Sequence, residues 1–355
     1  MIKMFSRLIK TGLCLVFITV LVLFAKYTSA LFFRFYPGFS RMALGTLSSL
    51  TSVLPISLWE LILVGLMIWG IYTFVKNLRP FRLHVWLSGV LLTLSAGALI
   101  FVALWGLNYF APSMESRMEL TEQQYTVEQL KEATSYYRDM ANQWAPEVRR
   151  NEKGAMVNYD FSDLSKRAPQ GYEVLGAQFP CFQGCTDPVK PLLFSKFFAM
   201  TGTTGMFIAF TGESTVSTET YPAAVPFTMC HEIGHRMAFA REDEANFAGF
   251  LACIENQAPE FRYSGYYMAF RYCYNALYKA DAGAAESVWY GVEEYLAADC
   301  NASVKHYEER RNEVLSTVTD AVYDSYLQSF DVESGVQSYG EVTDLLLSWY
   351  FERIK

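Results

Sequence analysis

Two histidines, His231 and His235, stand four residues apart in the segment His-Glu-Ile-Gly-His, with Glu232 between them. Because residues i and i+4 lie on one face of a helix, the two imidazole rings can bind one zinc ion. Glu232 is then placed to act as a base toward a water molecule at the metal. The chain has only four histidines in 355 residues, so a chance match is uncommon. The motif indicates the chemistry of a zinc hydrolase.

A catalytic zinc ion needs a third protein ligand. The class of enzymes that uses a third histidine requires Gly and His where this chain has Ala238 and Arg241. A carboxylate is therefore expected, and the acidic cluster that follows offers Glu242 first and Glu244 second, with Glu255 further on. Such a cluster is also typical of an exposed helix start, where carboxylates favour the positive end of the helix dipole.

This segment resembles the gluzincins, whose third ligand is a glutamate in a Glu-x-x-Ala-Asp pattern on a second helix. The chain has Glu242 and Ala245 at the matching positions and Asn246 in place of the aspartate. The resemblance implies that Glu242 binds zinc and that Asn246 lies beside a ligand histidine, accepting a hydrogen bond without supplying charge. A straight helix would carry Glu242 about 10 Å past His235 along its axis, so the chain must turn between them. No Gly or Pro at residues 236–241 predicts that turn.

Three apolar stretches, residues 8–31, 58–75 and 85–109, are long enough to cross a bilayer as helices. A buried core helix is the alternative for each. We interpret the first as an uncleaved anchor, because its apolar run exceeds that of a signal peptide and no Ala-x-Ala site follows. Residues 38–56 mix Ser and Thr with Leu and predict an interfacial or re-entrant segment.

The charges define the expected topology. Residues 1–110 contain one acidic residue, Glu60, against nine Lys or Arg, and the remainder of the chain is acidic. Basic residues precede the first stretch and fill the loop between the second and third, so the positive-inside rule places both in the cytoplasm. We expect a multi-pass protein of the cell membrane, with a cytoplasmic N-terminus, a membrane domain over 1–110 and an extracytoplasmic domain over 111–355. Trp105, Tyr109 and Phe110 suit an aromatic belt at the exit of the third stretch.

Residues 111–355 predict a mostly helical domain with a small sheet, which makes the fold class α+β. Thr126 is a plausible N-cap for a helix over 126–150, and the Gly- and Pro-rich residues 151–190 predict loops. Residues 205–211 predict a buried strand, and Pro226 suits the first turn of the helix that carries the motif. Further helices are expected at 242–256, 260–280, 284–300, 302–329 and 338–354.

Six of the seven cysteines fall in the part expected outside the cytoplasm: Cys181, Cys185, Cys230, Cys253, Cys273 and Cys300. Their even number permits disulfides, and a Cys181–Cys185 pair would close a small loop. Simple burial without pairing is an equal alternative.

Over nearly its whole length the chain resembles the membrane-anchored bacterial family called domain of unknown function 3810, which carries a gluzincin-like signature. The resemblance rests on the zinc motif with its acidic segment and on short segments elsewhere, namely Trp105-Gly-Leu-Asn-Tyr109, Pro188-Val-Lys-Pro191, Gly205-Met-Phe, Thr211-Gly-Glu-Ser, Ser338-Tyr-Gly340 and Leu345-Leu-Leu347. The family has no assigned reaction. The resemblance therefore implies an architecture and a metal site, and no substrate.

Similarity to zinc peptidases implies hydrolysis of peptide bonds with one Zn²⁺ ion, in which Glu232 takes a proton from water and delivers it to the leaving amine. An upstream edge strand would pair with an extended peptide, and its local candidates are Met206, Phe207, Ile208, Ala209 and Phe210. A group that stabilises the oxyanion remains open among Tyr266, Tyr267, Arg271 and Tyr272.

The expected partners are a peptide or protein substrate and the lipid bilayer, with no nucleic acid; the oligomeric state stays open. The alternatives are a non-catalytic membrane-bound sensor or structural protein that keeps zinc, and a membrane scaffold or transporter component with a chance motif. A closed set of four protein ligands would favour the sensor, because a structural site has no need of a base.

Overall fold

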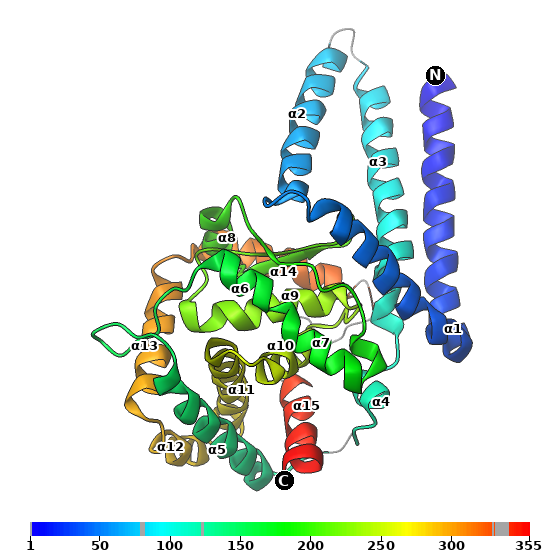
Figure 1. Cartoon of the computed structure of the whole chain (residues 1–355). Coiled ribbons are helices and arrows are strands. Elements are labelled where there is room, and N and C mark those ends of the chain that lie inside the picture. Colours follow the sequence, from blue (N-terminus) through cyan, green and yellow to red (C-terminus); the bar gives the residue numbers. More distant parts are fainter. Residues whose placement is uncertain (1, 79–81, 122–123, 329, 331–340) are drawn as a thin grey trace.

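A computed structural model describes residues 2–78, 82–121, 124–328, 330 and 341–355. Three N-terminal helices, α1 (Ile2–Thr51), α2 (Leu58–Leu78) and α3 (Leu83–Leu104), rise from a globular part that is mostly helical and contains one small sheet (Figure 1). The α+β fold class predicted from the sequence is confirmed.

The three N-terminal helices are long and apolar enough to cross a membrane, over Lys3–Thr28, Leu58–Leu78 and Leu83–Leu104. At most 17% of each apolar window is buried in the protein. An all-apolar helix that protein does not cover needs lipid around it. The alternative of buried core helices is therefore wrong.

Helix α1 continues well beyond the apolar stretch, to Thr51, with Pro37 inside it. Proline removes a backbone donor and bends a helix, and Figure 1 shows the second half of α1 turning back along the globular part. Ser40, Leu44 and Ser48 on this half are buried. Residues 38–51 thus form a helix packed on protein, which differs from the interfacial or re-entrant segment expected.

Helix α3 ends at Leu104, earlier than the expected 109, and a short 3₁₀ turn follows over Gly106–Phe110. Trp105 and Tyr109 are buried at 6% and 7% exposure, so they face protein and do not form the expected aromatic belt. The amide of Asn108 donates to Ser40 Oγ at 2.9 Å, which ties this turn to the second half of α1.

The globular part contains twelve described helices, whose bounds are α4 (Met114–Met118), α5 (Val127–Trp144), α6 (Phe161–Arg167), α7 (Pro169–Gln178), α8 (Ser195–Thr201), α9 (Val225–Arg236), α10 (Glu242–Glu255), α11 (Pro259–Ala280), α12 (Ala282–Trp289), α13 (Glu294–Glu308), α14 (Glu313–Gln328) and α15 (Glu341–Trp349). Thr126 caps α5 as predicted, in a reciprocal capping box with Gln129.

Several predicted boundaries are wrong. Helices α6 and α7 occupy part of the segment expected to be loops. Pro169 does not break α7, because it stands in the first turn, where its missing backbone N–H would have no partner within the helix. The stretches expected at 284–300 and 302–329 form α12, α13 and α14, with breaks after Trp289 and Glu308. The beginning of the helix expected at 338–354 lies outside the described residues, and α15 starts at Glu341.

The sheet has three strands in the order β1 (Lys190–Pro191), β3 (Glu213–Val216), β2 (Gly205–Ile208). Strand β2 runs antiparallel to β3 and lies at the edge, with Met206 opposite Thr215. It is shorter than expected, and its residues are half-buried, not buried as predicted, because one edge and face border open space in the globular part. Ala209 and Phe210 belong to the turn that follows, and Gly212 completes that turn with a positive φ of 66°.

The centre of the globular part is formed by α9, α10 and α11, whose largest aromatic residues are fully buried: Phe247, Phe250, Tyr263, Tyr267 and Phe270. A second apolar cluster joins α1, α3 and α14, through residues such as Phe33, Val102 and Leu327. All seven cysteines are unpaired. The burial alternative holds for Cys181, Cys230, Cys253 and Cys273.

Carboxylates join the N-terminal helices to the globular part. Glu213 of β3 accepts hydrogen bonds from the first two backbone N–H groups of α2, Leu58 and Trp59, each at 2.9 Å, and pairs with Lys190 at 2.7 Å. Conversely, the carboxylate of Glu60 in α2 accepts hydrogen bonds from the backbone N–H groups of Leu193 and Phe194, which directly precede α8. A carboxylate at a helix N-terminus satisfies unpaired donors and complements the dipole. The sheet is thereby fixed to the foot of α2.

Candidate metal centre

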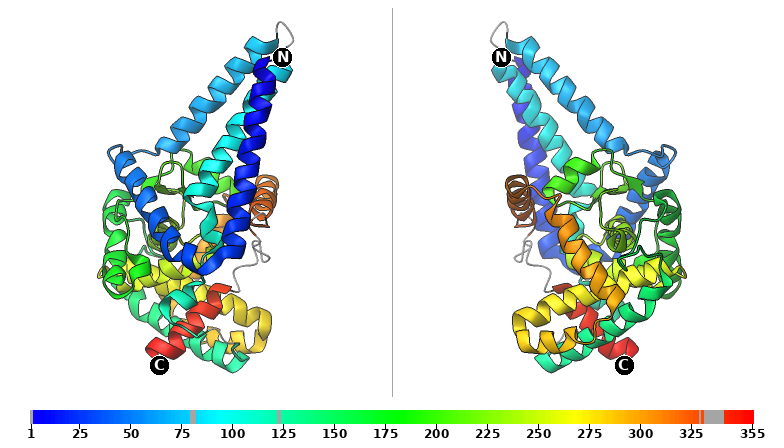
Figure 2. Two further views of the ribbon diagram at one scale, coloured as in Figure 1. Left: turned by 90° about the vertical axis from the view of Figure 1, so that its right-hand side faces the viewer. Right: turned by 90° about the vertical axis from the view of Figure 1, so that its left-hand side faces the viewer.

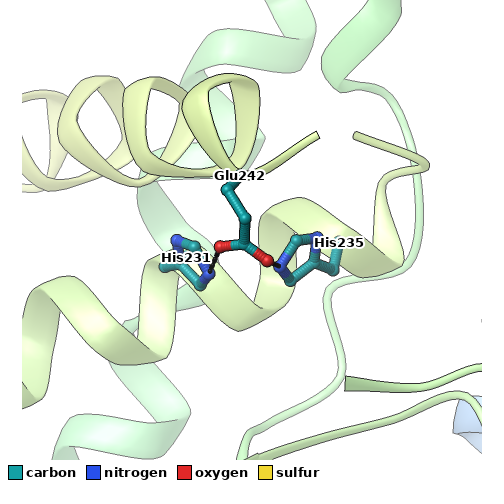
Figure 3. Close-up of side chains that lie close together, drawn as sticks. All are labelled: His231, His235 and Glu242. Carbon is teal, nitrogen blue, oxygen red and sulfur yellow. Dashed lines mark ion pairs between the residues drawn. The ribbon is translucent and has the colours of Figure 1, made fainter. Parts of the chain in front are cut away.

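The two histidines of the motif and Glu242 converge in one place. His231 and His235 lie one turn apart on α9, and Glu242 is the first residue of α10, which crosses above them (Figure 3). Glu242 Oε2 is 3.4 Å from His231 Nε2, and Oε1 is 3.5 Å from His235 Nε2. The ligand atoms all lie within 4.8 Å of one another. Two imidazole nitrogens and a carboxylate oxygen are a donor set that suits zinc, so the residues present fit a metal ion.

The turn that brings Glu242 back to the histidines is built without glycine. The N–H of Phe239 bonds to Gly234 O at 3.2 Å and that of Ala238 to His235 O at 3.0 Å, the two bonds of a Schellman motif. Ala238 takes the left-handed position with φ of 68°, where glycine is usual. This conformation costs about 1–2 kcal/mol for a residue with a Cβ. Full burial of Met237, Ala238 and Phe239 in the protein offsets it.

Contacts on both sides orient the ring of His235. Its Nδ1 lies 2.8 Å from Phe239 O, and because a carbonyl only accepts, Nδ1 carries the proton and leaves Nε2 free for a metal. The indole N–H of Trp105, at the end of α3, donates to the backbone carbonyl of His235 at 3.0 Å. The ring of Phe207 stacks on the imidazole with centroids 6.4 Å apart. His231 Nδ1 is buried and has no hydrogen-bond partner among the described residues.

The three ligand candidates perturb one another's protonation. Burial raises the pKa of Glu242, but the two histidines together lower it by more. The pKa of Glu242 therefore lies well below its usual range. Burial lowers the pKa of His235, but the charge of Glu242 and its hydrogen bond raise it to about 9. A metal ion that takes these donors must therefore displace a proton from His235.

Glu232 occupies a confined position beside this group. It is 3% exposed, and its Oε2 has no hydrogen-bond partner in the described part of the chain. Burial raises the pKa of its carboxyl to about 7, against the lowering influence of both histidines. A Cβ placed on Gly205 would lie only 2.3 Å from Glu232 Oε1, so the glycine leaves the space that the carboxylate fills. A buried acceptor with a pKa near neutrality is suited to taking and returning a proton.

The group opens into a cleft of about 1260 Å³. Strand β2 with Thr204 and Ala209 forms one side, and the end of α3 contributes Phe101 and Trp105. Helices α9, α10, α11 and α14 contribute most of the remaining lining. Within the described residues, the edge of β2 that faces away from β3 pairs with no other strand. The cleft thus combines a group of side chains that fits a metal ion, a buried carboxylate and a free strand edge.

The other ligand candidates lie elsewhere. Glu244 binds Arg117 at 2.6 Å and accepts from the backbone N–H of Met114 at 2.8 Å, so its carboxylate is used in structure. Glu255 is the last residue of α10, about 20 Å along that helix from Glu242. Asn246 lines the cleft, and its Oδ1 accepts from the hydroxyl of Tyr272 at 3.1 Å.

Of the residues considered for the oxyanion, Arg271 and Tyr272 line the cleft, whereas Tyr266 and Tyr267 are buried in the core. Sequence reasoning missed Tyr323 of α14, whose hydroxyl donates a short hydrogen bond to Glu242 Oε1. It lies 81 residues after Glu242 and carries no local signal.

The sequence matches the family described as "Protein of unknown function (DUF3810)" over residues 34–347, and the chain belongs to that family. No curated protein and no solved structure matches the chain.

Proposed function

We propose that this member of the family is a membrane-anchored zinc metalloendopeptidase. The observation that carries the proposal is the convergence of His231, His235 and Glu242 beside the buried Glu232 in a cleft edged by a free strand. Three protein ligands leave a fourth position for water, which supports catalysis over a closed structural site.

Zn²⁺ held by His231, His235 and Glu242 would lower the pKa of a water molecule and polarise the peptide carbonyl. Glu232 takes the proton from that water and passes it to the leaving amine. The burial of Glu232 supports this role, because it raises the pKa of the carboxyl to about 7, so the group can both take and return a proton near neutral pH. Phe239 O accepts a hydrogen bond from the proton on His235 Nδ1, so Nε2 is the nitrogen that would give up its proton and bind the metal.

An extended peptide would bind along β2, adding a strand to its open edge. Main-chain hydrogen bonds from this edge give affinity, and the alternating side chains of Met206, Phe207 and Ile208 give selectivity. Ala209 and Phe210 follow in the turn and border the end of this binding edge. The basic residues before the first span and in the loop between the second and third support a cytoplasmic N-terminus with the cleft on the other side of the membrane.

The test compares purified full-length variants for zinc content by mass spectrometry and for hydrolysis of a mixed-sequence fluorogenic peptide library. Glu232→Gln is expected to keep one zinc per chain and to lose about 10²–10⁴-fold in rate, the usual contribution of a general base. His231→Ala is expected to lose the metal as well. Unchanged hydrolysis in Glu232→Gln would contradict the proposal, and a metal bound by four protein side chains would establish the non-catalytic alternative.

A further inference from the structure

We propose that α8, the turn after β2 and α14 rest on the bilayer, and that the cleft between them takes peptide segments of polypeptides anchored in the same membrane. The substrate class named here rests on the proposed peptidase function. The contact with lipid stands on its own.

Helix α8 lies at the level where α2 leaves the membrane. The carboxylate of Glu60, in the first turn of α2, accepts from the backbone N–H groups of Leu193 and Phe194 at 2.8 and 3.0 Å. The rings of Trp59 and Phe198 pack at 6.0 Å. Helix α2 has 21 residues and is about 31 Å long, which equals the hydrocarbon thickness and leaves no excess length. We therefore place the residues bound to its first turn at the bilayer boundary, and Figure 1 shows α8 near the foot of α2.

The surface of α8 at this level is apolar. Leu193, Phe194, Phe197 and Met200 are 41%, 48%, 53% and 39% exposed. Soluble surfaces rarely expose such side chains contiguously, whereas a bilayer covers them favourably. Lys196 lies among them, and a lysine at this depth can extend its ammonium group to the lipid headgroups.

The end of α3 contacts the other two elements of the proposed surface. Phe101, in its last turn, packs against Tyr326 of α14 at 6.1 Å and against Phe210 of the turn after β2 at 6.3 Å. Figure 2 shows α14, in orange, next to the lower part of the N-terminal helices. Phe210 is 49% exposed, and α14 presents a stripe at i, i+4 and i+8 that is 73%, 58% and 67% exposed: Val314, Val318 and Val322.

The cleft lies between these lipid-facing elements. Helix α14 is tied to the end of α8 by the bond from Asn312 N to Met200 O at 2.9 Å, and its other face, with Thr319 and Tyr323, lines the cleft. The residues that join α8 to β2 line it as well, beginning at Gly202. A polypeptide anchored in the bilayer reaches this opening by diffusion in the membrane plane. Anchoring also raises its effective concentration at the strand edge.

Lipid contact is tested on the full chain reconstituted in phosphatidylcholine vesicles with or without brominated acyl chains. An environment-sensitive fluorophore is attached to Phe197→Cys, Val318→Cys or, as control, Tyr290→Cys. Tyr290 is 81% exposed and follows α12, at the end of the globular part away from the spans (Figure 1). The unsubstituted chain supplies the background from native cysteines. Brominated lipid should quench the first two labels and leave the third unchanged. Absence of quenching at Phe197 and Val318 would overturn the proposal and assign this surface to a protein partner.

The substrate class is tested with the same peptide library, free or fused to a single polyleucine membrane helix, in the same vesicles. The anchored form should be cleaved about tenfold faster or more, as expected for a raised effective concentration. The double variant Phe197→Glu, Val318→Glu should lose this preference while still cleaving the free form, and Tyr290→Glu should retain it. Equal cleavage of both forms by the unsubstituted chain overturns the substrate class. No cleavage of either form overturns the proposed peptidase function instead, and the quenching result still decides the lipid contact.

Discussion

Replacing Gly205 with Ala tests the role of Glu232 without touching any ligand candidate. The added Cβ would lie 2.3 Å from Glu232 Oε1 and 2.8 Å from its Cγ. The backbone of Gly205 needs no positive φ, so the strand itself accepts alanine. The carboxylate must therefore move away from the position it occupies now.

The size of that movement follows from the contact distance. An ordinary contact begins at 3.4 Å, so Oε1 must shift by about 1 Å, and a misplacement of 1 Å in a catalytic group costs about 10²-fold in rate. That loss corresponds to about 2.7 kcal/mol in the activation barrier. The fold should be little affected, since all the displaced atoms belong to the flexible side chain of Glu232 and none to the backbone.

The assay measures kcat/KM on the peptide library together with zinc content and thermal stability of the reconstituted chain. Gly176→Ala is the matched control, because a Cβ there meets its neighbours at 3.4 Å or more. We expect Gly205→Ala to keep its zinc and stability and to lose about 10²-fold in kcat/KM. Activity within about twofold of the unsubstituted chain, with zinc retained, would refute the assignment of Glu232 as the base.

Further variants test Glu242 as a metal ligand, the roles of its neighbours Glu244 and Tyr323, and the ion pair at the foot of α2. Glu242→Gln should weaken zinc binding in a competition titration by more than the roughly 10–100-fold typical of residues that support a ligand, whereas Glu244→Gln, which alters a structural ion pair, should lower stability and leave zinc affinity unchanged. Tyr323→Phe removes the hydrogen bond to Glu242 and should reduce zinc affinity about 10–100-fold in the same titration; an unchanged affinity would show that this bond does not tune the ligand. Glu213→Gln leaves the charge of Lys190 buried without its partner and should lower the free energy of unfolding by about 3–5 kcal/mol in denaturant titrations. Lys190→Met in the Glu213→Gln background should recover part of the loss, and no recovery would contradict the ion-pair explanation.

One of the short segments that resemble the family has a clear structural role, whereas Ser338-Tyr-Gly340 lies outside the described residues. In Thr211-Gly-Glu-Ser, Thr211 O accepts from the hydroxyl of Thr51, and a Cβ on Gly212 would lie 2.4 Å from Leu44 O. Ser214 donates to the backbone carbonyl of Glu232 at 2.7 Å. Four consecutive residues therefore connect α1 and α2 with the helix that carries the zinc motif.

The sequence alone determined the features that depend on short-range patterns. Helical spacing placed His231 and His235 on one face of a helix, and apolar length marked the three N-terminal helices. The N-cap at Thr126 was also predictable from its neighbours, because a capping box involves residues only three apart. The edge strand was found by composition, although its end at Ile208 was not.

Only the tertiary structure decided how distant segments complete the site. The turn at Ala238 gives no sequence signal, because its left-handed conformation is imposed by burial of its neighbours and not by glycine. Tyr323 reaches Glu242 and Trp105 reaches His235 through packing between elements 81 and 130 residues apart. Such contacts depend on which helices lie side by side, and the local propensity of a segment does not predict its neighbours in space. The His-Glu-x-x-His motif was therefore evident from five residues, and Glu242 followed from its resemblance to a known pattern. The turn that brings Glu242 to the histidines and the position of this group below the N-terminal helices required the folded chain.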